Sequence, residues 1–375
     1  IMIYIVFTFF LFALGYKLSL KKNVFNHNIY YFVLFMLFII SAFRYQVGCD
    51  WDGNIFMYLN ASDISISDIV ERRDKLSWAI LIFLQEMDLI YPFINIITSA
   101  IFFIGIHALA QRQPDPLTFL ILLFPVLIIA MPMSGIRQAA AIGLICIAFV
   151  SFIDRRPIRF VIWVMIATGL HGSAIVFLLM LPFSTGRYNL ERFFLVFMIL
   201  VLALIFYIPN SDSFNSATRI YIGDSRYGID ADGAKYRTSF LSLSAIYFFF
   251  FLKKKWRKTF PSDYNLINLG AFGMLMLPAL LPLSSVIADR FGYYFIPFQI
   301  MIFARIYHIQ FKSNNLFYSL LPYFLVFMFF FSWTQLSFIF EYCYVPYKTW
   351  FFGLPEANVP GPRMPYGEFF RGPTN

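Results

Sequence analysis

Long apolar segments separated by short polar ones run through almost the whole chain. They lack the strict alternation of apolar and polar residues that marks the strands of a membrane β-barrel. Because only helices and closed barrels satisfy their backbone hydrogen bonds in lipid, the pattern predicts membrane helices. The apolar segments are 2–19, 29–43, 91–110, 116–131, 135–153, 158–183, 192–209, 238–252, 264–284, 291–307 and 316–333.

The predicted fold is an all-α, polytopic transmembrane bundle of about 10–12 helices with short outer loops. Several segments fall short of the roughly 20 residues of a straight crossing and would extend into flanking aromatic residues. We see no internal repeat, so we expect one integral membrane domain over residues 1–333 and a C-terminal tail on the outer side over 334–375. The first apolar segment, 2–19, is followed by lysines and not by a cleavage site. This pattern favours a membrane-spanning helix over a cleaved signal peptide.

Two segments depart from simple spans. Residues 76–89 are amphipathic, and we expect them to lie in the membrane interface or dip into it without crossing. Segment 158–183 is too short for two crossings, and His171-Gly172-Ser173 forms a natural break at its centre. Irregular backbone is tolerated in membranes where it lines a cavity, which favours a re-entrant helix here. The alternative is a single long span.

Composition supports lipid as the main solvent. The 375 residues are 60% hydrophobic and 13% charged, with a mean hydropathy of +0.71. Soluble domains are typically about 45–50% apolar and about 25% charged. The net charge of +9 is explained by Lys and Arg in cytoplasmic loops, so nucleic acid is not an expected partner.

The basic loops also orient the chain. The cluster Lys253–Lys258 is the strongest and is predicted to be cytoplasmic, together with Lys17, Lys21, Lys22, Arg155, Arg156, Arg159, Arg305 and Lys312. The loop 44–75, the turn 132–135, the loop 210–236 and the turn at Asp289-Arg290 then lie on the outer side.

Three arginines and a histidine stand at the outer ends of these segments: Arg44, Arg137, His171 and Arg290. A guanidinium presents a planar fork of donors that matches phosphate oxygens, and it keeps its charge at physiological pH. We therefore expect Arg44, Arg137 and Arg290 to bind a pyrophosphate at the membrane surface. Each has a simpler alternative, since Arg44 could extend to lipid headgroups, Arg137 could pack or extend in the same way, and Arg290 could pair with Asp289.

Two residues could deprotonate a hydroxyl beside such a phosphate. Asp50 is kept ionised by Arg44 in the same segment, and His171 titrates near physiological pH. His171 could instead be a core histidine. Residues with polar or flat side chains beside these groups are expected to contact substrate, although membrane-interface aromatics explain Trp51 and Tyr58 equally well. These residues are Trp51, Tyr58, Gln138, Tyr293 and Tyr294.

Metal binding is not expected. Asp50 and Asp52 could hold a divalent cation with phosphate oxygens, but three arginines make a metal unnecessary. The cysteines Cys49, Cys146 and Cys343 show no metal-ligand spacing. A Cys49–Cys343 disulfide requires both residues to face an oxidising side, which sequence alone does not decide.

Four motifs resemble the signatures of EpsG-like membrane proteins, a branch of the Wzy-type polysaccharide (O-antigen or capsule) polymerases. They are RYQVGCDWDGNIFMY (44–58), GIRQAAAIGL (135–144), LHGSAIVFLL (170–179) and DRFGYYF (289–295), in the family's order. One departure is Trp51, which stands where the family commonly has tyrosine.

The resemblance implies a fold like the C superfamily of glycosyltransferases and a site on the periplasmic face of the bacterial inner membrane. It also implies a polymerase that joins undecaprenyl-pyrophosphate-linked oligosaccharides, which are both donor and acceptor, without a cofactor. The bilayer and a chain-length regulator are the other expected partners. The alternatives are an O-antigen ligase or acyltransferase, and a flippase for lipid-linked sugars. A ligase would carry a larger late outer loop, and a flippase would show two similar halves.

Overall fold

The computed structural model describes residues 1–19, 27–64, 68–69, 72, 74–184, 191, 194, 197–198, 231, 233–310 and 316–353. Within these ranges the regular secondary structure is helical, with turns and loops between the helices and an isolated antiparallel β-bridge between Arg44 and Thr349. The predicted all-α fold is therefore confirmed. Most of segment 192–209 and most of the predicted loop 210–236 lie outside the described residues.

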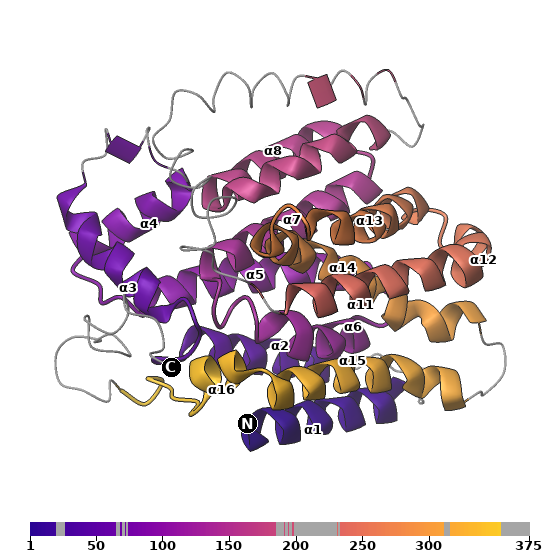
Figure 1. Ribbon diagram of the computed structural model, residues 1–375, viewed down its shortest axis with the longest axis horizontal. Helices are drawn as coiled ribbons and strands as arrows, with labels where there is room; N and C mark the ends of the chain where they lie inside the picture. The colour runs from indigo at the N-terminus through magenta and orange to yellow at the C-terminus, as the bar shows by residue number, and fades with distance from the viewer. Residues whose placement is uncertain are drawn as a thin grey trace.

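Figure 1 labels the α-helices. In chain order the elements are α1 (Met2–Ser19), α2 (His27–Ala42), α3 (Trp51–Leu59), η1 (Asn60–Asp63), α4 (Lys75–Glu86), α5 (Phe93–Ala110), α6 (Pro116–Leu123), η3 (Phe124–Ile128), α7 (Ile136–Ile153), α8 (Pro157–Leu170), η4 (Gly172–Phe183), α11 (Ala234–Tyr247), η5 (Phe248–Leu252), α12 (Lys253–Thr259), α13 (Tyr264–Met276), η6 (Leu277–Leu280), α14 (Ser285–Gln310), α15 (Leu316–Leu336) and α16 (Phe338–Tyr344).

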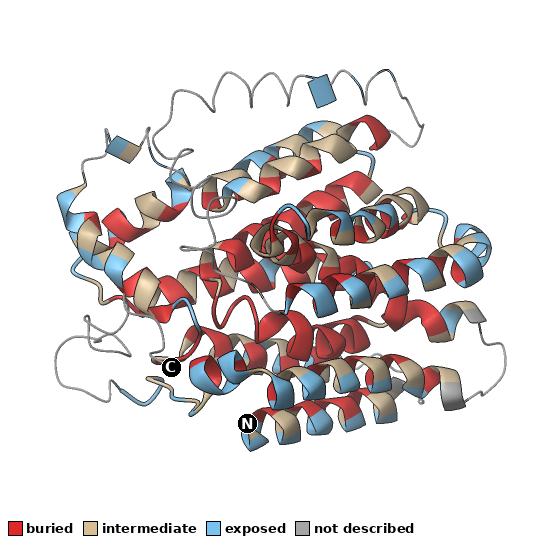
Figure 2. Ribbon diagram, viewed as in Figure 1, coloured by how far each residue is buried: buried red, intermediate tan, exposed pale blue. Residues whose placement is uncertain are grey.

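The centre of the bundle is the α5–α7 pair. A Cβ added to Gly105 would lie 1.8 Å from the carbonyl oxygen of Gly143, so only glycine permits this close backbone approach. Small residues at such crossings are typical of membrane helix packing, where close van der Waals contact drives association. Nearly all of α7 is buried, and Figure 2 shows buried residues concentrated around it.

The outer helices expose large apolar side chains. Phe9 on α1, Phe32 on α2 and Phe324 on α15 are each 60% exposed or more. Soluble monomers rarely present apolar surface on this scale, so these faces contact lipid and the protein is a helical membrane protein.

Few of the described helices have the length for a full crossing. Three are long and apolar enough: Phe93–Ala110, Ile136–Ile153 and Tyr318–Leu336. Six further apolar helices in the described ranges have 10–17 residues. The expected 10–12 crossings are therefore not matched by that many full-length helices in the part of the chain described.

The two ends of the bundle differ in chemistry. Lys253–Lys258 occupy α12 at one end in Figure 1, whereas α3 and α4 lie at the other. Arg305 lies at the α12 end but is only 1% exposed, rather than in a loop. It pairs with Asp263 and donates from Nε to Gln113 Oε1 at 3.0 Å. Arg305 therefore links this end of α14 to the loops that contain Asp263 and Gln113.

The predicted break at His171 is present. Helix α8 ends at Leu170, His171 is extended, and the chain continues as the 3-10 helix η4. Phe177 on η4 packs against Tyr294 and Phe295 of α14, so η4 runs back into the bundle. At about 1.5 Å per residue, the 14 residues of α8 reach about 21 Å, short of the ~30 Å hydrocarbon core.

The first part of the expected C-terminal tail packs on the helices. Phe340 on α16 is fully buried, and Tyr4 of α1 donates to the carbonyl oxygen of Tyr344 at 2.9 Å. Beyond α16, Tyr45 N donates to Lys348 O and Trp350 N donates to Phe43 O, both at 2.9 Å. We name residues 345–353 the C-terminal strap, because they lie along the segment that follows α2.

Candidate functional site

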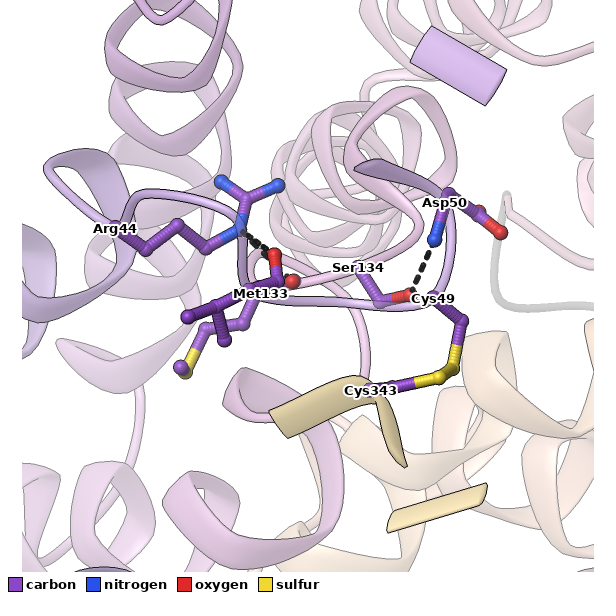
Figure 3. The surroundings of a disulfide bond; sticks show 7 residues. Arg44, Cys49, Asp50, Met133, Ser134 and Cys343 are labelled. Atoms are coloured by element: carbon purple, nitrogen blue, oxygen red, sulfur yellow. Dashed lines mark hydrogen bonds between the residues drawn. A yellow bond between two sulfur atoms is a disulfide. The ribbon is translucent and has the colours of Figure 1, made fainter. Parts of the chain in front are cut away.

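Arg44 anchors the loop between α2 and α3. Its side chain is fully buried, and Nε donates to Val47 O at 3.0 Å and to Met133 O at 2.8 Å (Figure 3). Burial, the largest effect, lowers the pKa of the Arg44 guanidinium, and nearby Asp50 acts in the opposite direction. These carbonyl contacts favour a positioning role over the expected direct contact with pyrophosphate.

Gly48 explains the glycine in the first motif. Its φ of +102° belongs to the left-handed region, and an added Cβ would lie 1.9 Å from Met133 O. Its N–H donates to Cys343 O at 2.7 Å, and the adjacent Cys49 forms a disulfide with Cys343. The loop is thus held against both the turn before α7 and the end of α16.

Asp50 emerges from this clamped loop onto the surface. Its residue is exposed, and its backbone N–H donates to Ser134 Oγ at 3.4 Å (Figure 3). A Cβ on Gly135 would lie 3.7 Å from Asp50 Oδ2, so the carboxylate borders the first turn of α7. That turn carries Arg137, which places the two predicted residues on adjoining elements.

Asp74 joins Arg137 to the break at His171. Its Oδ2 accepts from Arg137 Nη1 and its Oδ1 accepts from Gly172 N, both at 2.8 Å. The pair is partly buried, with 30% of the Arg137 side chain exposed. Asp74 also precedes α4, where Ser77 Oγ donates to Leu170 O at 2.8 Å. The amphipathic segment therefore packs on α8 beside the site.

The His171 ring takes part in a short series of polar side-chain contacts. Its Nδ1 lies 2.7 Å from Ser173 Oγ, and that hydroxyl lies 3.2 Å from the Oη of Tyr294. Tyr294 is fully buried on α14, one turn beyond Arg290. Gln138 Nε2 donates to Arg290 O at 2.5 Å, so the predicted substrate residue Gln138 joins α7 to α14.

The sequence patterns did not single out one further arginine of this cluster. Arg237 on α11 is only 8% exposed, pairs with Asp289, and has its guanidinium carbon 3.9 Å from the centre of the Tyr293 ring. Residues 289, 290, 293 and 294 lie within two turns of α14, so Arg237 joins the same cluster. It stands at the start of an apolar segment, as Arg137 does, and that signal could have revealed it. Asp74 was not predicted either, and its position before an amphipathic segment is a weaker signal.

Two of the predicted substrate aromatics pack against neighbouring parts of the protein. Trp51 is fully buried and packs edge-on against Tyr45 and Tyr91, at ring-centroid distances of 5.5 and 5.0 Å. Tyr58 donates to Leu89 O at 2.7 Å and packs on Tyr91. Their positions argue against the expected stacking on sugar because both rings pack α3 against the residues that precede α5.

Among the described residues, no group of three or more His, Cys, Asp or Glu side chains could hold a metal ion. The free thiol Cys146 is buried in α7. The ionisable side chains of the site are arginines, carboxylates and an imidazole.

The arrangement defines a helical membrane protein with a cluster of cationic and proton-accepting side chains at one end of its bundle. The EpsG family model matches residues 27–349, and the chain belongs to this family of Wzy-like, polysaccharide polymerase-related membrane proteins. All four sequence motifs fall inside the matched range. No curated protein and no solved structure matches the chain.

Proposed function

We propose that the protein is a polysaccharide polymerase that joins undecaprenyl-pyrophosphate-linked oligosaccharide repeats at the outer face of the bacterial inner membrane. The observation that supports this most is the convergence of Asp50, Arg137, His171 and Arg290 from four separate segments. Family membership supports the polymer chemistry, and the residue roles below are part of the proposal.

The reaction transfers the glycan from one lipid carrier to another. An acceptor hydroxyl oxygen attacks the anomeric carbon of the donor, the bond from that carbon to the pyrophosphate oxygen breaks, and undecaprenyl pyrophosphate leaves. Arg137 and Arg290 would bind the pyrophosphate and stabilise the negative charge that grows on it. Arg237 is a third cation beside them, although Asp289 neutralises part of its charge. These contacts supply the charge compensation that a divalent metal would otherwise give.

The proton of the attacking hydroxyl would pass to Asp50 or His171. Asp50 is exposed and fixed by the clamped loop, which suits access by an acceptor. His171 is partly buried, and its Nδ1 contact with Ser173 leaves Nε2 as the ring nitrogen to take a proton. Arg44 would act indirectly, by holding the loop that carries Asp50.

Purified protein in liposomes with lipid-linked repeats extracted from the source cells should form polymer. Asp50→Asn and His171→Gln are compared. Whichever of the two removes the catalytic base should lower turnover about 10²–10⁴-fold. It should also lose the pH-dependent limb of the rate profile, which the other variant retains. Two variants that both polymerise at the wild-type rate would refute this base assignment, and a wild type that forms no polymer would refute the function.

The outer location of the site gives a separate prediction. Disulfides persist in oxidising compartments, so Cys49 and Cys343 should face the periplasm. A membrane-impermeant maleimide added to spheroplasts should label the protein only after treatment with an impermeant reductant. In a Cys49→Ser, Cys343→Ser variant, buried Cys146 remains and should not react. Labelling that requires permeabilised membranes would contradict the proposed orientation.

A further inference from the structure

A cavity of about 480 Å³ lies between the end of α3 and the start of α4 and has no part in the chemistry described above. One wall is formed by the end of α3 with η1, through Phe56, Asn60 and Asp63. The other includes Arg72 and Trp78, on either side of the start of α4. We name this space the α3–α4 cavity.

The lining combines aromatic surface with hydrogen-bonding groups. The guanidinium carbon of Arg72 lies 4.7 Å from the centre of the Trp78 ring, and Phe56 is 50% exposed. Aromatic faces carry a negative potential that favours the C–H groups of a sugar ring. Asp63 accepts hydrogen bonds and Arg72 donates them, so the pair can bind sugar hydroxyls both as donors and as acceptors. An acyl chain would make no hydrogen bonds to these polar groups, which disfavours lipid as the occupant.

Both walls of the cavity begin at the candidate site. Helix α3 starts directly after Asp50, and Phe56 and Asn60 lie six to ten residues farther on, about 9–15 Å at 1.5 Å per residue. Helix α4 starts directly after Asp74, which binds Arg137, and Trp78 is one turn beyond it. A glycan whose pyrophosphate end is bound by Arg137 is therefore within reach of the cavity.

We propose that the α3–α4 cavity is a saccharide subsite that binds a sugar residue of the repeat unit away from the reacting carbon. The inference rests on the proposed function for the identity of the glycan. The subsite contributes affinity and selectivity for the repeat, while the arginine cluster performs the transfer.

The test uses a variant with Asp63→Ala and Arg72→Ala together, since both side chains are exposed and the change removes their hydrogen-bonding groups together with the Arg72 contact on Trp78. Lys75→Ala is the matched control, because Lys75 is an exposed residue at the start of α4, close to Arg72 in the chain, that does not line the cavity. In liposomes, the double variant should show a KM for the lipid-linked repeat raised about tenfold with unchanged kcat, as expected when hydrogen bonds made equally in the ground state and the transition state are lost. An unchanged KM would overturn the subsite and leave the polymerase function standing.

A binding measurement keeps the two proposals separate. The probe is the free oligosaccharide released by mild acid from lipid-linked repeats of the source cells, titrated into the full-length protein by calorimetry. Wild type and Lys75→Ala should bind it, and the double variant should bind about tenfold more weakly. This result would support the subsite even if no polymerisation were seen. Equal binding by all three proteins, or no binding by wild type, would overturn it.

Discussion

Replacing Arg137 with alanine should lower polymer formation by about 100-fold or more. The guanidinium donates to Asp74 at 2.8 Å, which orients it beside the break at His171 and keeps it partly exposed for a ligand. Loss of a single donor that stabilises developing charge typically costs about 10²–10³ in rate. Arg137→Lys should recover only part of the activity, because an ammonium retains the charge but not the planar fork. Initial rates in liposomes at saturating lipid-linked repeat measure the effect.

Arg112 provides a matched control for this variant. It also pairs with an aspartate, Asp154, at 2.9 Å, and it is a half-exposed residue. That pair lies near the start of α6, away from the site, so Arg112→Ala should polymerise like wild type. If Arg137→Ala forms polymer at the wild-type rate, Arg137 does not contact the pyrophosphate. If both variants lose activity equally, the loss is not specific to the site.

Replacing Arg44 with methionine should destabilise the protein more than any change to the exposed site residues. The carbonyl oxygens of Val47 and Met133 would lose their buried donor, and each unsatisfied group costs about 1–3 kcal/mol. We therefore expect a loss of roughly 2–6 kcal/mol in the free energy of unfolding. Denaturation of the detergent-solubilised protein, followed by tryptophan fluorescence, measures it.

Lys348→Met is the comparison for Arg44. Lys348 donates to Gln46 Oε1 at 3.1 Å on the exposed side of the same loop, so its loss should cost under about 1 kcal/mol. An Arg44→Met protein that keeps wild-type stability but does not polymerise would contradict the positioning role. It would instead restore Arg44 as a direct ligand of the pyrophosphate.

The apolar pattern predicted most helices because lipid imposes length and apolarity on each segment separately. The break at His171 was also predictable from the local sequence, because Gly172 and Ser173 follow His171 directly. The number of full crossings was not predictable in the same way. Helices α6, α11 and α13 end in π or 3-10 turns, and α8 is shortened by the break, which depends on packing against neighbours.

The site was predicted less completely than the fold. Motifs located Asp50, Arg137, His171 and Arg290 because arginine, aspartate and histidine are unusual at the ends of apolar segments. The sequence does not contain the distances that separate a ligand from a structural support. Arg44 carries the same local signal as Arg137, yet it is buried against carbonyl oxygens that come partly from residue 133, far along the chain.

The most direct test of the central claim is a density map of the full-length protein in lipid nanodiscs with undecaprenyl pyrophosphate bound. We predict pyrophosphate oxygens about 2.7–2.9 Å from guanidinium nitrogens of Arg137 and Arg290. The carbonyl-bonded Arg44 should lie outside this contact shell. A pyrophosphate bound at the opposite end of the bundle, beside the lysines of α12, would contradict the account.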